Sequence, residues 1–150
     1  MVTESYASIS EGTDILVRRL NTDAWDDADA DDITKALAQS TDIIDRLNFL
    51  GDKASETQEL QFPRGTDSEI PNDVKIACVL IAMALLDGVD PDMEAENLRM
   101  VAQGYGNIRS TYDALSPSEH ILAGVPSVEA WRYLKPYLRD PRELKLNRVS

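Results

Sequence analysis

The sequence predicts a mainly α-helical protein, and three observations support this fold class. Apolar residues recur every three or four positions in long segments, residues that cap helices precede several of those segments, and no run of strands with regular turns is visible. The 150 residues, 43% of them hydrophobic, are enough for one domain with its own core. We expect a small bundle of about four helices with a long loop and a short extended segment. The helical domain covers residues 1–139, and an extended C-terminal arm covers residues 140–150.

The first two helices are predicted in the N-terminal third. Ser8 and Glu11 have the spacing of a capping box, in which a hydroxyl and a carboxylate bind the free amides of a helix start. A first helix is therefore expected over residues 8–20. A second, amphipathic helix is expected over residues 31–50, with Gly51 as its stop.

A loop and a very apolar third helix follow. Residues 52–71 show no period and contain Pro63, Gly65 and Pro71, so they predict a loop, anchored by Leu60 and Phe62. The third helix is expected from a cap at Asn72 to Leu86, closed by Gly88. Because this helix is apolar on nearly every side, it must be surrounded, and we expect another chain to supply part of that covering.

The C-terminal half contains weaker signals. Asp90-Pro91 predicts the start of a fourth helix, and the alternation over residues 103–113 predicts a short extended segment. Ser116 has capping-box spacing for helical turns reaching Ala123, and Ser127 caps a last helix that Pro136 shortens. The expected inner face of the fourth helix consists of Met93, Leu98, Val101 and Ala102.

The charge distribution is uneven. Fifteen basic residues against 27 acidic ones give a net charge of −12, which argues against a fold-wide surface for nucleic acid. From Trp131 onward the net charge is +4, and the preceding 130 residues carry −16. The chain is thus an acidic body with a basic end.

Catalytic, metal and cofactor signals are weak. His120 is the only histidine, and its neighbours are better explained as helix caps. Cys78 lies in the longest apolar run, so it is expected to be an inert core thiol. This run has 11 residues and is too short to cross a membrane as a helix. The aspartates of residues 23–32 lack the glycine and closing glutamate of a calcium loop, and Trp25 among them is expected to plug a helix pair. We predict no enzyme, no metal and no cofactor.

The C-terminal aromatic and basic residues form the candidate site. Aromatic and arginine side chains dominate binding at protein interfaces, so these residues predict a surface for a partner. A different interpretation remains open, in which the last helix simply closes its own domain. The candidate interface residues are Trp131, Arg132, Tyr133, Leu134, Tyr137, Leu138, Arg139, Arg142, Leu144, Leu146 and Arg148.

The order of landmarks along the chain resembles the phage head-tail adaptor family, whose members often carry the label DnaT-like single-stranded DNA-binding protein. The landmarks are Ser5 to Ser8, Trp25, Phe62-Pro63-Arg64, Ile70-Pro71, the apolar helix, residues 108–112 and Tyr137-Leu138. The resemblance implies a ring below the portal, expected to be a dodecamer, that joins capsid to tail. It also implies contacts with the portal and a tail or neck protein, assembly in the host cytoplasm, and a place in the virion neck.

Three features of the sequence agree with that resemblance, and the first is the very apolar third helix, which would find neighbours in a ring. An acidic wall lets DNA pass through a channel without binding it, and the basic arm suits a partner such as the portal. A single-stranded DNA-binding replication module is the alternative, but such a module needs aromatic platforms set in positive charge. Only residues 131–148 approach that description.

Overall fold

The computed structural model describes residues 5–104 and 119–139, and it confirms the mainly α-helical fold class. Within these ranges the chain has no β-strand, only two isolated β-bridges, Phe49 with Leu138 and Lys53 with Arg64. None of the helices described there is long and apolar enough to cross a membrane. The helices are α1 (Ile9–Leu16), α2 (Asp23–Asp26), α3 (Ala30–Asp45), α4 (Asn72–Leu86), α5 (Pro91–Gly104), α7 (Glu119–Leu122), α8 (Val128–Leu134) and the 3-10 turn η1 (Lys135–Tyr137).

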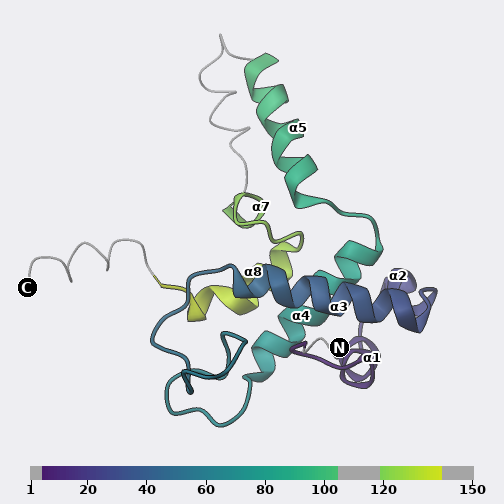
Figure 1. Ribbon diagram of the computed structural model, residues 1–150. Helices are drawn as coiled ribbons and strands as arrows, with labels where there is room; N and C mark the ends of the chain where they lie inside the picture. The colour runs from purple at the N-terminus through teal and green to yellow at the C-terminus, as the bar shows by residue number, and fades with distance from the viewer. Residues whose placement is uncertain (1–4, 105–118, 140–150) are drawn as a thin grey trace, which may run out of the picture.

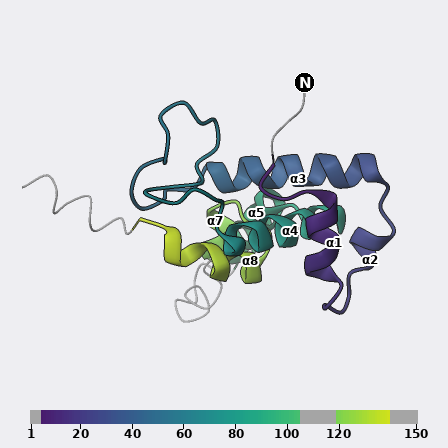
Figure 2. The ribbon, with the colours of Figure 1, turned by 90° about the horizontal axis from the view of Figure 1, so that it is seen from below.

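Helix α4 is the centre of the bundle. It contacts α1, α2, α3 and α8, and α3 lies on one side of it while α8 lies on the other (Figure 2). Helices and loops of the same chain supply most of the cover of α4, and the expectation that another chain covers the remaining part stays a prediction. Its buried residues are Val74, Ala77, Cys78, Val79, Leu80, Ile81 and Ala82.

Helix α1 begins as the sequence predicts but ends early. The amide of Glu11 donates to the Ser8 hydroxyl and the amide of Ser8 donates to the Glu11 carboxylate, each over 3.1 Å, which confirms the capping box. The helix ends at Leu16 rather than near residue 20, and the chain reverses further on at Asn21, where φ is +62°. This turn brings Trp25 against α1, where its side chain is buried, as expected for a structural plug.

Helix α3 also ends earlier than predicted. It starts after Asp29, whose carboxylate accepts from the amide of Asp32 over 2.9 Å, and it stops at Asp45. The residues beyond it pair with the C-terminal segment: the Leu50 amide donates to the Tyr137 carbonyl over 2.8 Å. Leu50, the last residue of the predicted helix, therefore lies outside α3 and is exposed.

The bounds of α4 and α5 differ in detail from the prediction. Pro71 occupies the cap position of α4, one residue before Asn72, and Gly88 ends the helix turn with φ +88°. Helix α5 stands away from the rest of the bundle (Figure 1), and Met93 on it is exposed rather than inward. The side chains of Leu98, Val101 and Ala102 lie outside what the structure describes.

Two other predictions fall largely outside the described residues. Of the extended segment expected over 103–113, only Gln103 and Gly104 are described, and both are helical. The capping residues at 116–118 are also outside, so the predicted helix start is not described; the helical turns expected to reach Ala123 are seen as α7, Glu119–Leu122. The arm, residues 140–150, lies outside the described ranges as well.

The long loop over residues 46–71 is held by an aromatic cluster around Phe62. The Phe62 ring packs edge to face with Tyr6, Phe49 and Tyr137, at centroid distances of 5.9, 4.6 and 5.8 Å. Arg64 adds backbone contacts, because its Nε donates to the Leu50 carbonyl over 2.8 Å. Phe62 is buried and Leu60 packs on the core, so both predicted anchors are confirmed.

A small polar network lies inside the core. The Ser40 hydroxyl donates to the Cys78 carbonyl over 2.7 Å, and the Thr41 hydroxyl donates to the Leu37 carbonyl over 2.9 Å while it accepts from the Tyr6 amide. Every buried side-chain nitrogen or oxygen in the described part of the chain has a partner. The network therefore holds the N-terminal segment against α3 and α4. Because each of its buried polar atoms has a hydrogen-bond partner, none of them is desolvated without compensation.

Candidate interaction surfaces

The C-terminal helix α8 uses its apolar residues inside the domain. Ser127 caps it as predicted, with its hydroxyl accepting from the Ala130 amide over 3.2 Å. Trp131 and Leu134 are buried on the side that faces α4. The interpretation that this helix closes its own domain therefore holds for these two members of the candidate interface.

Three further members pack partly on the core. Tyr133, Tyr137 and Leu138 are half-buried against it. The Tyr137 hydroxyl lies 3.3 Å from a carboxylate oxygen of Asp73, and burial together with that negative charge raises the pKa of Tyr137. These side chains attach the end of the described chain to the loop and to the start of α4.

The basic members remain at the surface. Arg132 is exposed and Arg139 is half-buried, with its backbone amide donating to the Asn48 carbonyl over 2.9 Å. The remaining candidates, Arg142, Leu144, Leu146 and Arg148, lie outside the described residues. Among the described candidates, the apolar and aromatic side chains are thus buried or half-buried, whereas Arg132 is exposed and Arg139 is half-buried.

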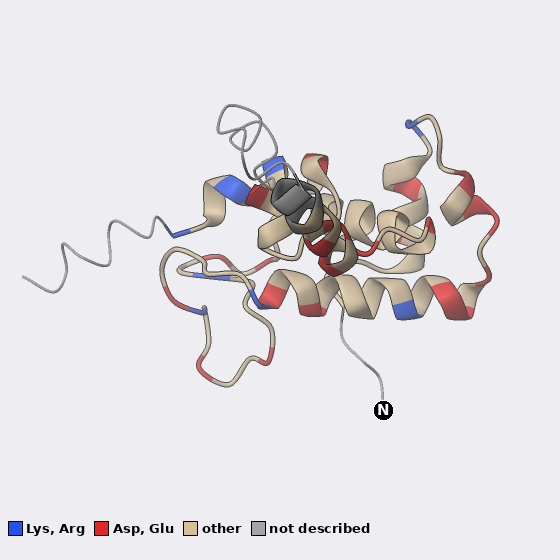
Figure 3. Cartoon of the chain, turned by 90° about the horizontal axis from the view of Figure 1, so that it is seen from above, with Lys and Arg blue, Asp and Glu red and all other residues tan. Residues whose placement is uncertain are grey.

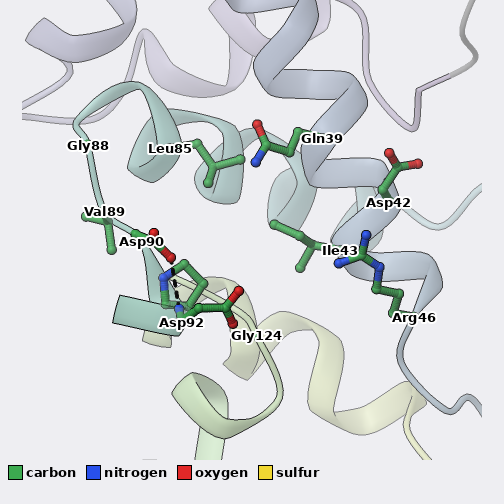
Figure 4. Close-up of a pocket in the computed structure, with 11 residues that line it drawn as sticks. Gln39, Asp42, Ile43, Arg46, Leu85, Gly88, Val89, Asp90, Asp92 and Gly124 are labelled. Atoms are coloured by element: carbon green, nitrogen blue, oxygen red, sulfur yellow. Dashed lines mark hydrogen bonds between the residues drawn. The ribbon is translucent and has the colours of Figure 1, made fainter. Parts of the chain in front are cut away.

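A hollow of about 440 Å³ lies between α3, the turn from α4 to α5, and Gly124 (Figure 4). Its polar lining includes Asp42, Arg46, Asp90 and Asp92. Asp90 is already used as a helix cap, since its carboxylate accepts from the Asp92 amide over 3.0 Å. The hollow contains no nucleophile with a neighbouring base, so it offers no catalytic arrangement.

The two residues with the most reactive side chains have structural roles. His120 lies with its Nδ1 2.9 Å from the Val125 carbonyl, inside the turn that follows α7. Cys78 is buried, and burial raises the pKa of its thiol, which disfavours the reactive thiolate. Among the described residues no group of three or more His, Cys, Asp or Glu side chains is placed to hold a metal ion.

One half-buried carboxyl group, that of Asp45, makes stability depend on pH. The Tyr6 hydroxyl donates to Asp45 and accepts from the Phe62 amide over 3.2 Å. Burial raises the pKa of Asp45 above its ordinary value of 3.8, against the opposing effect of the Tyr6 hydrogen bond. The folded chain therefore holds this proton more tightly than the unfolded chain does.

We expect the free energy of unfolding to fall as the pH rises from 3.8 through the raised pKa of Asp45, because ionisation disfavours the folded state. Asp45→Asn keeps an acceptor for Tyr6 but cannot ionise, so its urea-unfolding profile should lack this decline. Glu56→Gln, a change at an exposed position, is the matched control and should keep the wild-type profile. An unchanged pH profile in Asp45→Asn would refute the assignment.

The surface lacks the features of a nucleic-acid interface in the part of the chain that is described. Figure 3 shows acidic segments along α3 and around the shorter helices, whereas the basic segments are short and separated. Three basic side chains are engaged in ion pairs: Arg19 with Glu129, Lys75 with Glu11, and Lys135 with Glu119. Binding to phosphates would have to compete with these contacts.

The tryptophan and phenylalanine rings are equally unavailable for stacking on bases, whereas Tyr133 and Tyr137 are half-buried and Tyr105 and Tyr112 lie outside the described residues. Single-stranded DNA-binding surfaces present aromatic rings on which bases stack. Both tryptophans and both phenylalanines of this chain are buried, namely Trp25, Trp131, Phe49 and Phe62. No exposed Trp or Phe is therefore left for a base.

Comparison with known proteins gives one result. Residues 2–148 match the protein family described as “putative DnaT-like ssDNA binding protein”. The chain belongs to this family. No curated protein and no solved structure matches it. The match covers nearly the whole chain.

Proposed function

We propose that the chain is a structural head-tail adaptor of a phage, one subunit of a ring that lies below the portal and joins the capsid to the tail. The observation that carries the proposal is that all Trp and Phe side chains are buried while the chain has 27 acidic against 15 basic residues. A protein with these properties is suited to packing beside other proteins and not to binding DNA. The order of sequence landmarks supplies the link to phage adaptors.

The acidic body has a physical role in this proposal. Exposed carboxylates such as Asp31, Asp32 and Asp42 on α3 repel DNA phosphates. A ring that presents such residues to its channel lets the genome pass without specific binding. The expected partners are other copies of the chain in a ring of twelve, the portal, and a tail or neck protein.

The basic end supplies the contact with the portal in this proposal. Arg132 and Lys135 are exposed, and the residues after 139 add Arg142, Lys145 and Arg148. Positive charge on an otherwise acidic protein orients it toward an acidic partner surface. The protein would be assembled in the host cytoplasm, become part of the virion neck, and need no cofactor or catalytic group.

A second candidate is a single-stranded DNA-binding replication module. The family description favours it directly. Its weakness is that the described residues offer neither an exposed Trp or Phe ring nor a continuous basic surface. The two candidates differ in where the protein is found and in whether it binds DNA.

The test uses the intact chain in both settings. Electron microscopy of purified particles, with an antibody against this chain, should place it at the neck. A gel-shift assay with a single-stranded oligonucleotide should show no complex at about 150 mM salt. Absence from the particles, together with a strongly salt-dependent shift, would overturn the adaptor proposal and support the replication module.

A further inference from the structure

The exposed large apolar side chains of the described residues are not scattered. Six of the seven fall in two places, and the seventh is Leu50. Exposed apolar groups that gather in patches mark surfaces for other proteins more often than single ones do. The first group is Met93, Met100 and Leu122, and the second is Val17, Leu20 and Val128.

The first group, called here the α5 patch, lies on the projecting helix and its neighbour. Met93 and Met100 are 58% and 68% exposed and are seven residues apart, so they lie on one face of α5. Helix α7, which carries Leu122, packs on α5 more than any other helix described does. Figure 1 shows α5 extending away from the bundle.

The α5 patch is acidic. Asp92, Glu94 and Glu96 on the same helix are all exposed. A surface that combines methionines with carboxylates fits a partner that is apolar with basic residues at its edge.

The second group, called here the α1 patch, has that complementary composition. Val17 and Leu20, which are 76% and 88% exposed, follow the end of α1. The ion pair between Arg19 and Glu129 holds this segment beside the start of α8, where Val128 is exposed. The two segments, far apart in sequence, therefore form one surface.

The α1 patch carries exposed arginines. Arg18 lies between Val17 and Leu20, and Arg132 is four residues after Val128, on the same face of α8. These arginines stand out in a chain with a net charge of −12. The α1 patch thus combines apolar side chains with exposed arginines, and the carboxylates at the same segments are Asp14, Asp23 and Glu129, the last paired with Arg19. The α5 patch combines apolar side chains with exposed carboxylates.

We infer that the α5 patch of one copy docks on the α1 patch of a second copy of this chain. Because the two patches are different surfaces at different places on the molecule (Figure 1), the contact is head-to-tail and repeats from copy to copy. Such a contact closes into a ring when the rotation between copies allows it. This inference rests on the proposed ring assembly and deepens it by naming the surfaces that meet.

The test uses two variants that each lose one patch. Met93→Asp/Met100→Asp loses the α5 patch and keeps the α1 patch, and Val17→Asp/Leu20→Asp does the reverse. Each variant alone should self-associate at least about tenfold more weakly than the wild type, measured by sedimentation. Leu50→Asp, the exposed apolar position outside both patches, is the matched control and should associate as the wild type does.

Mixing the two double variants gives the decisive result. One intact α5 patch and one intact α1 patch are then present, so a 1:1 dimer should form and nothing larger. The dimer also shows that both variants are folded. A mixture that stays monomeric, a wild-type chain that stays monomeric at about 1 mM, or an equal effect of Leu50→Asp overturns the inference.

The outcome is separable from that of the proposed function. If the chain is found at the phage neck but both double variants self-associate as the wild type does, the adaptor proposal stands and the assignment of the two patches is refuted. A 1:1 dimer from the mixture, with the chain absent from particles, would support the surfaces and overturn the adaptor proposal.

Discussion

Phe62→Ala is expected to lower the free energy of unfolding by about 3–5 kcal/mol, the usual cost of removing a buried phenylalanine. Its ring is buried and contacts three other aromatic rings, so the cavity cannot collapse without moving several segments. Since domains are stable by only about 5–15 kcal/mol, the change should also lower Tm by about 10 °C. Urea and thermal unfolding measure both.

The loss should also appear in a defined part of the molecule. Phe62 joins the segment at Tyr6, the loop at Phe49 and the turn at Tyr137. Amide hydrogen exchange in Phe62→Ala should therefore speed up in these three segments together, more than in the centre of α4.

Two variants control this prediction. Phe62→Leu keeps most of the volume and loses the edge-to-face contacts, so it should cost less than half as much as the alanine change. Leu50→Ala changes an exposed residue in the same loop and should cost little. An alanine variant at Phe62 no less stable than Leu50→Ala would show that the aromatic cluster does not hold the loop.

The existence of the main helices could be predicted because their signals are local. Ser8 and Ser127 cap helices as their spacing predicts, and the apolar period locates α3 and α4. The ends of α1 and α3 could not be predicted, because they depend on distant parts of the chain. The pairing of the Leu50 amide with the Tyr137 carbonyl is an example, since it joins residues far apart in sequence.

The candidate surfaces were harder to predict for the same reason. Trp131 has the composition of an interface anchor, but whether it faces α4 or solvent depends on how α8 docks. The apolar residues on nearly every side of α4 suggested cover from another chain. The helices that cover it, α1, α2, α3 and α8, come together only in the folded chain, so the sequence does not show them as its neighbours. The pairing of Arg19 with Glu129, which creates the α1 patch, left no local signal in the sequence.

Gly12→Ala is the second large effect, and its sign is opposite to that expected for an ordinary helix. Alanine in place of glycine within a helix usually stabilises by about 0.5–1 kcal/mol. At Gly12 the added Cβ would lie 2.5 Å from Cη2 and 2.6 Å from Cζ2 of Trp25, closer than carbon atoms can approach. The expected result is a loss of about 1–3 kcal/mol in the free energy of unfolding, measured by urea denaturation.

A double-mutant cycle with Trp25→Phe tests whether that contact is the cause. Phenylalanine lacks the Cη2 and Cζ2 atoms that meet the new Cβ, so Gly12→Ala should become neutral or stabilising in the Trp25→Phe chain. Thr13→Ala, at the exposed neighbouring position in α1, should have the same small effect in both chains. If Gly12→Ala costs as much beside phenylalanine as beside tryptophan, close packing of α1 on Trp25 is not what requires glycine there.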